Sequence, residues 1–405
     1  MKILQVATGF PISFPGGITN YVRTLSRTQI ALGHHVEILS GPENDMGPID
    51  FATAVHQFKG VGSAFCLSVN RDDKQATFRL AELLSKFDII HFHMGYGLPA
   101  SFFLSQTQTP YIVSLHDYGL ICPRIFMMDK WGQLCESRDL TRCRKCVGQF
   151  EQINFVRAGL GRLGWKVPTL SSNAVVKRAE RLDHFLAKAK RRLAVSKRVA
   201  EIFENAIPGV SCDVVHIGNE SSQQIPSRDS WAPNGKIRCG FIGTLNRDKG
   251  ANVLIDLVRS VPLERFDFGF WGRGEDRYLD ELRRLGVACN GAYRPSELNK
   301  ILQEVDVGLV LPIWNDNGPQ VLMEFLNNGI PVLGTNMGGV PDFLTKTTGF
   351  IFNPSEGIED AARWLQTLDE TRLAEMHSQI KPLKNPVEHC NEVIDIYSQV
   401  LGTEI

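Results

Sequence analysis

Short apolar runs that end at turns alternate with amphipathic stretches along the first half of the 405-residue chain. Such runs are typical of buried parallel strands, and the stretches between them fit helices that cover a sheet. The strands expected on this basis are Met1–Thr8, Val36–Leu39, Asp88–His91, Tyr111–Leu115, Arg192–Val195 and Val214–His216. The helices expected between them are one that follows Gly16-Gly17, one at Gln75–Lys86 and a short one at Ala100–Gln106. The alternation predicts a Rossmann-like α/β domain.

The same alternation begins again after residues 218–236, which are polar, rich in Pro, Gly and Ser, and without period. The second set comprises strands at Ile237–Ile242, Phe266–Trp271, Val307–Leu311 and Ile330–Leu333 and a helix at Gln320–Asn328. We therefore expect a domain at 1–217, a linker at 218–236, a second domain at 237–384 and a C-terminal helix at 385–405 that packs back on the first domain. Ligands of open α/β sheets bind at the carboxyl ends of strands, so a cleft between the two domains is the expected site.

Composition places the chain among ordinary globular proteins, with 43% hydrophobic and 22% charged residues. Lys plus Arg and Asp plus Glu each number 44, so net charge gives no argument for a nucleic-acid partner. The first residues lack the regions of a signal peptide, and no run of about 18 apolar residues occurs. We expect a cytoplasmic protein.

The most informative stretch is residues 309–344, where Asp316 precedes an expected helix and Glu324 lies eight positions later. Gly318, Pro319 and Gln320 mark the start of that helix, whose free N–H groups suit a diphosphate. The Glu324 carboxylate can accept hydrogen bonds from a ribose, and Asp316 can accept them from sugar hydroxyls. Either acid alone is better explained as a helix cap or a solvated side chain. The whole pattern favours a binding site.

Other motifs follow expected strands. Lys249 stands before a helix in residues 241–250, where its ammonium can neutralise a diphosphate as a point charge. His116, followed by Asp117, comes directly after the strand Tyr111–Leu115. Alone it is better explained as a structural histidine. We expect His91 and His93, at the end of the preceding strand, to point to opposite faces, so that at most one faces the cleft.

Together these motifs resemble glycosyltransferase family 4, whose signature is two glutamates separated by seven residues, then an apolar Gly-Pro strand and a Gly-Gly turn. Asp316 stands in place of the first glutamate and Glu324 in place of the second, and Gly329–Val332 and Met337–Asp342 fit the strand and the turn. The family's arginine after the first glycine of residues 241–250 is replaced by Thr244.

The resemblance implies the α/β GT-B fold, in which two Rossmann-like parallel-sheet domains face each other across a cleft. It implies a retaining transferase that moves a sugar from a nucleotide-sugar, with UDP-sugar favoured, to a lipid-linked or glycan hydroxyl acceptor in surface polysaccharide or glycolipid biosynthesis. The catalytic residues implied are His116, Asp316 and Glu324. The donor-binding residues implied are Gly16, Gly17, Thr244, Arg247, Lys249, Ala292, Tyr293, Gly318, Pro319 and Gln320. For Gly16-Gly17 alone, an ordinary strand-to-helix turn is the better explanation.

The sequence contains no Asp-x-Asp motif, so donor binding is expected without a catalytic metal ion. Two alternatives remain open. The shortened acid at Asp316 and the missing arginine at Thr244 also fit a non-catalytic GT-B partner protein. A sugar-nucleotide epimerase on the same fold is the other alternative, and it would release free sugar without an acceptor.

Four of the nine cysteines cluster with the spacing C-x12-C-x7-C-x2-C, at Cys122, Cys135, Cys143 and Cys146. Four thiolates within 25 residues can hold a structural zinc ion. Free thiols and a redox pair are the alternatives. Catalytic zinc is not expected, because four ligands leave no open position.

A basic stretch lies between Phe155 and Arg198, where twelve Lys and Arg residues face only Glu180 and Asp183. A basic stretch with aromatic residues suits an anionic membrane surface or a lipid-diphosphate acceptor. It indicates peripheral contact with the cytoplasmic face of the inner membrane. A solvated helix face is the alternative.

Overall fold

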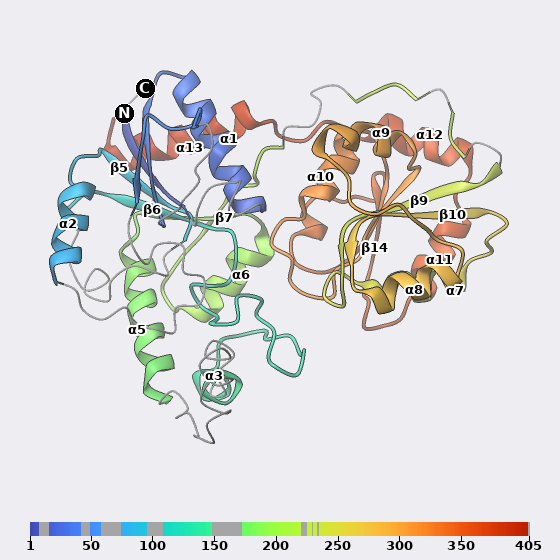
Figure 1. Cartoon of the computed structure of the whole chain (residues 1–405), viewed down its shortest axis with the longest axis horizontal. Coiled ribbons are helices and arrows are strands. Elements are labelled where there is room, and N and C mark those ends of the chain that lie inside the picture. Colours follow the sequence, from blue (N-terminus) through green and yellow to red (C-terminus); the bar gives the residue numbers. More distant parts are fainter. Residues whose placement is uncertain are drawn as a thin grey trace. The chain divides into compact units, whose positions relative to one another are not determined.

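The computed structural model describes residues 1–7, 16–41, 49–57, 74–94, 108–147, 172–219, 225–228, 230–232 and 235–403. The chain divides into two compact units (Figure 1). The first unit comprises Met1–Ile217 and Pro386–Ile405, and the second comprises Gly218–Asn385.

The first unit contains, within the described residues, a seven-stranded sheet in the order β3-β2-β1-β5-β6-β7-β8. Every pairing in it is parallel. Its strands are β1 (Lys2–Val6), β2 (His35–Ser40), β3 (Ala54–Gln57), β5 (Ile89–Phe92), β6 (Tyr111–Leu115), β7 (Arg191–Ala194) and β8 (Asp213–Val214). Parallel neighbours need crossover connections, which the helices between them supply. The central strands β5 and β6 are buried throughout, which is why they read as continuous apolar runs.

The helices of the first unit are α1 (Gly17–Ala31), α2 (Lys74–Leu84), α3 (Leu140–Val147), α5 (Ser172–Lys188), α6 (Lys197–Ala206) and α13 (Pro386–Leu401). The start of α6 is capped by Ser196, whose hydroxyl accepts the Val199 N–H at 3.4 Å. The last helix, α13, packs against α1, and Figure 1 shows the two side by side. Its Tyr397 is fully buried, so the end of the chain completes the interior of the first unit.

The second unit holds a six-stranded sheet in the order β11-β10-β9-β12-β13-β14, again parallel throughout its described strands. These are β9 (Ile237–Leu245), β10 (Phe266–Gly274), β11 (Ala288–Cys289), β12 (Val307–Val310), β13 (Val332–Thr335) and β14 (Gly349–Phe352). The helices are α7 (Ala251–Ser260), α8 (Asp276–Arg284), α9 (Leu298–Gln303), α10 (Gln320–Asn327), α11 (Glu359–Gln366) and α12 (Glu370–Gln379), with short 3-10 turns at Pro295–Glu297 and Val340–Asp342.

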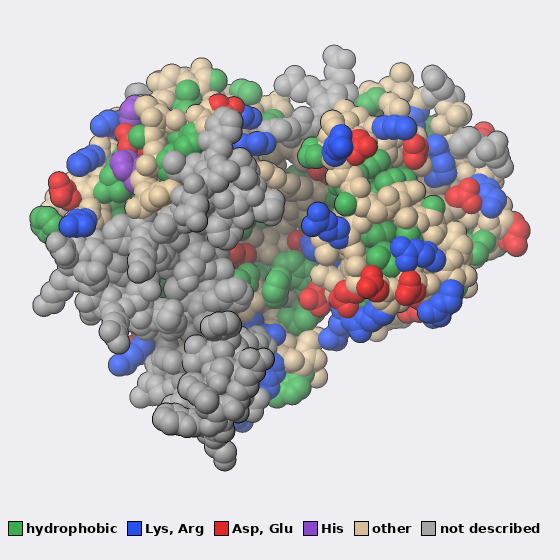
Figure 2. Space-filling model, viewed as in Figure 1, with side chains coloured by type: hydrophobic (Ala, Val, Ile, Leu, Met, Phe, Trp, Pro, Cys, Tyr) green, Lys and Arg blue, Asp and Glu red, His purple; other side chains and the backbone are tan. Residues whose placement is uncertain are grey.

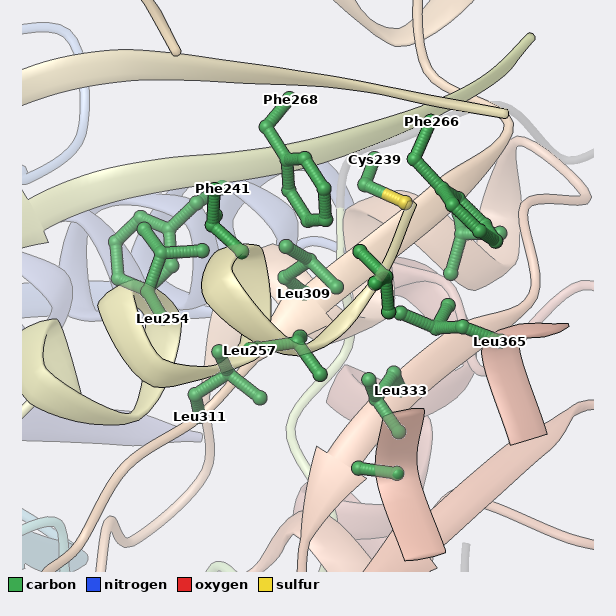
Figure 3. Close-up of a cluster of buried hydrophobic side chains, with 14 of the residues drawn as sticks. Cys239, Phe241, Leu254, Leu257, Phe266, Phe268, Leu309, Leu311, Leu333 and Leu365 are labelled. Atoms are coloured by element: carbon green, nitrogen blue, oxygen red, sulfur yellow. The ribbon is translucent and has the colours of Figure 1, made fainter. Parts of the chain in front are cut away.

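The core of the second unit lies between this sheet and its helices. Figure 3 shows Phe241 of β9 and Phe268 of β10 close to Leu254 and Leu257 of α7. On the surface of the unit, Figure 2 shows acidic and basic side chains interspersed, and Arg283 of α8 pairs with Asp280 at 3.0 Å. The charges there neutralise one another locally.

The predicted pair of Rossmann-like parallel-sheet domains is therefore confirmed. Sequence analysis missed the edge strands β3, β11 and β14, and its strand at Ile330–Leu333 is observed two residues later, at β13. The reason is local, because the Ile330 N–H bonds back to Phe325 and Pro331 has no N–H to donate. The helix expected at Ala100–Gln106 lies outside the described residues.

Candidate functional site

Two loops at the carboxyl ends of β9 and β12 meet in the second unit. The Ile313 N–H donates to the Asp248 carbonyl at 2.9 Å. Gly250, at φ 89°, lies so close to the β12 loop that a Cβ there would come within 1.8 Å of the Leu311 oxygen. Glycine is therefore required at this contact. The contact holds Lys249 against the loop that leads to α10.

Lys249 and Asp316, two of the predicted site residues, form an ion pair. The Lys249 Nζ lies 2.5 Å from the Asp316 Oδ2 and 5.5 Å from the centre of the Trp314 ring. The Lys249 backbone N–H is bound by the Asn246 side chain at 2.9 Å. The Lys249 side chain is 39% exposed and that of Asp316 is 11% exposed, so the ammonium remains accessible while the carboxylate is mostly enclosed.

The Gly-Gly turn of the family signature packs on the Asp316 loop. The Gly339 N–H donates to the Asp316 carbonyl at 2.7 Å. Gly338 has φ 56°, and a Cβ on it would lie 1.9 Å from the same carbonyl oxygen. The turn thus holds the backbone of the shortened acid in place, and it needs glycine for both conformation and space.

Helix α10 begins directly after this loop, and its first residue is Gln320. Pro319 occupies the N-cap position and provides no side-chain cap. The Leu322 N–H donates to the Pro319 carbonyl at 3.1 Å, so the N–H groups of the first two residues of the helix are the ones suited to an anion. Asn317, before the helix, is buried, and its side-chain Nδ2 has no partner among the described residues. Gly318 lies between Asn317 and Pro319 and is partly buried.

Glu324 lies one turn into α10, and burial raises the pKa of its carboxyl to about 7. Tyr293 is its neighbour from the loop after β11. Burial first, and then the negative charge of Glu324, raises the pKa of Tyr293 to about 12. Ala292, beside Tyr293, is exposed. The structure therefore brings this loop to Glu324, as the predicted site requires.

Thr244 and Arg247 are both exposed. The β9–β10 register pairs Thr244 with Arg273, an exposed residue near the end of β10 that sequence analysis missed. Residues paired in neighbouring parallel strands project from the same face of the sheet. Arg273 therefore supplies a cation beside the position where the family has one. Its setting in Gly272-Arg273-Gly274 is the signal that could have found it.

Gly16 and Gly17 lie at the start of α1, in the first unit, and both are exposed. Gly16 has extended backbone, and open space surrounds the place of a Cβ on it. The fold itself therefore does not demand glycine at Gly16, which leaves room for a ligand at this turn. Whether these glycines approach a donor stays a prediction.

His116 follows β6 and is partly exposed. Its Nε2 lies 3.1 Å from the Nδ1 of His93, and the Tyr21 ring packs against it with the ring centres 4.6 Å apart. The Asp117 Oδ1 accepts the Gly119 N–H at 2.7 Å, which shapes the turn.

The expectation that His91 and His93 point to opposite faces is wrong. Residues two apart in a strand project from the same face, and the two ring centres lie 4.1 Å apart. Both side chains are buried. Burial lowers the pKa of His91 and His93 well below the usual range, and it lowers that of His116 to about 3, with the charge of His389 adding to the effect. All three rings are neutral at physiological pH.

None of the four clustered cysteines is joined in a disulfide within the part of the chain that the structure describes, and Cys122 and Cys146 are buried. Burial first, and then the charges of the other three, raises the pKa of Cys143 to about 12, so the four sulfur atoms share one neighbourhood. Among the described residues, however, no group of His, Cys, Asp or Glu side chains stands ready to hold a metal ion. Structural zinc stays a prediction, which metal analysis of the purified chain would test.

The basic stretch is largely engaged within the first unit where the structure describes it. The Arg192 guanidinium donates to the carbonyls of Leu186 and Ala189, and Arg198 pairs with Glu201 at 3.1 Å. Its members Arg157, Arg162 and Lys166 and the aromatic Trp165 lie outside the described residues. Across the helices that the structure describes, none is long and apolar enough to span a membrane.

Comparison with known proteins identifies two sequence families along the chain. The pattern of the family described as Glycosyltransferase Family 4 matches residues 15–219. The pattern of the family described as Glycosyl transferases group 1 matches residues 236–369. Each match covers most of one structural unit.

The curated relatives are distant. Sulfoquinovosyl transferase SQD2 of Arabidopsis thaliana is 27% identical over 155 residues, which are 36% of this chain and 29% of that protein. The putative colanic acid biosynthesis glycosyltransferase WcaL of Escherichia coli is 22% identical over 267 residues, which are 61% of this chain and 64% of that protein. The chain thus matches less than two thirds of the length of either relative.

Solved structures match the whole chain. Anabaena Alr3699/HepE in complex with UDP superposes with a TM-score of 0.66 at 15% identity, covering 98% of this chain and 100% of that one. Sucrose-phosphate synthase from Thermosynechococcus elongatus gives a TM-score of 0.68 at 13% identity, covering 99% of each. At such identities the likeness concerns the fold alone, and the predicted GT-B fold is confirmed.

Proposed function

Because this chain belongs to glycosyltransferase family 4, we propose that it transfers a sugar from a nucleotide-sugar donor to a hydroxyl of a lipid-linked or glycan acceptor. The reaction belongs to surface polysaccharide or glycolipid biosynthesis and retains the anomeric configuration. The observation that carries the proposal is the accessible ammonium of Lys249, held beside Asp316 at the uncapped start of α10.

The leaving group in such a transfer is a nucleoside diphosphate, so the enzyme must stabilise developing negative charge. Lys249 and the free N–H groups of the first turn of α10 are suited to this role, and Arg273 adds a cation beside Thr244. With these groups in place, departure of the diphosphate requires no covalent nucleophile from the protein. The departing phosphate is then the base that receives the acceptor proton.

The two carboxylates, Asp316 and Glu324, bind the uncharged parts of the donor, which are the sugar and the ribose. Glu324 is enclosed, and its ionised form accepts hydrogen bonds from ribose hydroxyls. Asp316, held by the Gly338-Gly339 turn, accepts them from the sugar. In the first unit, His116 contacts the reacting sugar and helps to orient it.

A uridine nucleotide is the favoured donor base. Alr3699/HepE, which shares the fold, is described in complex with UDP and also with UDP-glucose. WcaL is described as a putative colanic acid biosynthesis glycosyltransferase, which supports a glycan or glycolipid acceptor. Contact with an anionic membrane surface through the basic stretch belongs to the proposal as the route to a lipid-linked acceptor.

The test is nucleotide release from UDP-, GDP- and ADP-sugars, with and without EDTA and with membrane extract as acceptor source. The Glu324→Ala variant is measured in parallel, and Glu304→Ala, an exposed glutamate elsewhere in the second unit, serves as control. We expect release from one donor that persists in EDTA and is lost only in Glu324→Ala. NMR analysis of the product then shows whether the transfer retains the anomeric configuration of the sugar.

Two results would overturn the proposal. Equal release of nucleotide and free sugar without any acceptor would indicate an epimerase. If no nucleotide bound and none were released with any donor, the chain would be a non-catalytic partner protein.

A further inference from the structure

A set of buried polar side chains, most of them joined by hydrogen bonds, crosses the interior of the first unit and ends at His116. It joins β1, α1, β5, β6 and the returning helix α13, although no strongly polar residue is expected in such a core. Its members are Gln5, Tyr21, Gln29, His91, His93, Ser114, His389 and Tyr397. All of them are buried. Buried polar groups are costly unless each donor meets an acceptor, so the direction of every hydrogen bond matters.

One end of this set is anchored by a backbone carbonyl, which can only accept. The His389 Nδ1 lies 3.1 Å from the His216 carbonyl oxygen and must therefore carry a hydrogen. The His389 Nε2 lies 2.8 Å from the Tyr21 Oη.

In the core, the Tyr397 oxygen accepts from the Gln29 amide at 3.3 Å and from the Gln5 amide at 3.4 Å. Its hydroxyl hydrogen is therefore donated to the His91 Nδ1 at 2.7 Å. Because His91 is neutral, its Nε2 carries a hydrogen and donates to the Ser114 hydroxyl at 2.7 Å.

The orientation of the Gln5 and Gln29 amides then determines which nitrogen of His93 carries the hydrogen. Gln5 also donates through Nε2 to the Gln29 Oε1 at 2.8 Å, so its Oε1 faces His93 as an acceptor. The His93 Nε2 lies 2.7 Å from that oxygen and must carry the hydrogen. Because His93 is neutral, its Nδ1 is bare and accepts from the His116 Nε2–H at 3.1 Å.

We propose that His93 is a positioning residue that holds His116 in the Nε2–H tautomer and leaves the His116 Nδ1 as a hydrogen-bond acceptor. The Tyr21 ring, tilted by 59° against His116 with the ring centres 4.6 Å apart, restrains the orientation of the imidazole. Reversal of the His93 tautomer would put a bare Nε2 against the Gln5 Oε1, and two acceptors would then face each other unpaired. The preference therefore originates at Gln5 of β1 and is transmitted through His93 to His116.

The consequence for recognition rests on the proposed function. A histidine in this tautomer accepts a hydrogen bond from a sugar hydroxyl through Nδ1 and cannot donate one there. It is thus selective for a free hydroxyl over an ether or ester oxygen at the contacted position of the sugar. The tautomer itself does not depend on that role.

The experiment is a long-range proton–nitrogen NMR correlation on the full chain labelled with ¹⁵N-histidine, which distinguishes the two tautomers of each ring. The His116 signals are assigned by their loss in His116→Gln. We expect the Nε2–H pattern in the wild type. His93→Asn keeps an acceptor oxygen at the place of Nδ1 and should retain the pattern, whereas His93→Leu removes the acceptor and should abolish the preference.

Turnover supplies the second readout. With a donor in hand, we expect His93→Leu to lower kcat by about tenfold with little change in KM, and His93→Asn to restore most of it. An Nδ1–H pattern or a cationic ring for His116 in the wild type would overturn the proposal. An unchanged tautomer in folded His93→Leu would overturn it as well. A chain without transferase activity that still gave the Nε2–H pattern would refute only the proposed function.

Discussion

Glu324 offers a test of whether the second unit contains a binding site built at the expense of stability. The substitution Glu324→Gln keeps the size of the side chain and its ability to accept one hydrogen bond, but removes the titratable charge. Burial raises the pKa of this carboxyl from 4.5 to about 7. The native state therefore resists its ionisation, and the unliganded protein is destabilised once the pH forces the charge to form.

The magnitude follows from that difference in pKa. At about 1.4 kcal/mol per pH unit, it corresponds to roughly 3 kcal/mol. The sign is set by a folded pKa above the unfolded one. The protonated side chain is tolerated below pH 4.5, and the loss of stability develops between pH 4.5 and about 7. The loss of stability is complete at pH 8. Glu324→Gln should therefore be more stable than the wild type at pH 8 by up to about 3 kcal/mol, and equally stable at pH 4.5.

Urea unfolding followed by tryptophan fluorescence suits this measurement. The positions of four of the six tryptophans, 231, 271, 314 and 364, fall within Gly218–Asn385. With a slope of about 2 kcal/mol per molar urea, the variant's midpoint should rise by up to about 1.5 M at pH 8. Glu304→Gln, at an exposed position in the same unit, should leave the midpoint unchanged at both pH values.

Raising the pH should increase the affinity for the donor, whereas it decreases the stability of the unliganded protein. The wild type should lose affinity for the nucleotide as the pH falls below about 7, because the protonated carboxyl accepts ribose hydroxyls poorly. Glu324→Gln should bind weakly at every pH. A variant no more stable than the wild type at pH 8, or a gain that does not vary with pH, would refute the argument from burial. A stabilised variant with undiminished affinity would refute only the binding role.

Three further predictions concern the same unit. Lys249→Met keeps the apolar stem but removes the charge beside the leaving diphosphate, so nucleotide release should fall by about 100-fold, and an unchanged rate would exclude the role. Arg273→Ala should weaken UDP binding about tenfold by calorimetry, with Thr244→Arg restoring it in the double variant; equal affinity in Arg273→Ala would place Arg273 outside the site. Gly338→Ala should destabilise the second unit by about 2 kcal/mol or more, because its Cβ would overlap a carbonyl of the facing loop. Gly286→Ala, at φ 83° with open space around it, is the matched control, and equal losses in urea unfolding for the two variants would contradict the reasoning.

Hydrophobic periodicity was sufficient to predict the architecture, because buried parallel strands must be apolar on both faces. The strands β1, β6 and β9 and the helix α10 lie within a few residues of the predicted positions. The two-residue difference at β13 and the missed strands β3, β11 and β14 have a local cause. Their limits depend on which backbone groups find ladder partners, and a single apolar run does not encode that.

For the candidate site, too, the sequence predicted some features and only the structure showed the others. Sequence alone singled out Lys249, Asp316 and Glu324, because they belong to a longer pattern of acids, glycines and apolar runs that matches the family signature, although either acid alone would have been explained as a cap or a solvated side chain. Sequence could not pair Lys249 with Asp316, since 67 residues separate them and their contact depends on how the loops after β9 and β12 pack.

Composition and motif spacing thus determined the fold class and the chemical types of the predicted site residues. The tertiary structure alone decided which residues act on one another. Arg273 became a candidate only through the register of β9 with β10. The link from His116 to Tyr397 exists only because α13 returns to the first unit. Hydrogen bonds and ion pairs act over a few ångströms, and only packing brings distant segments within that range.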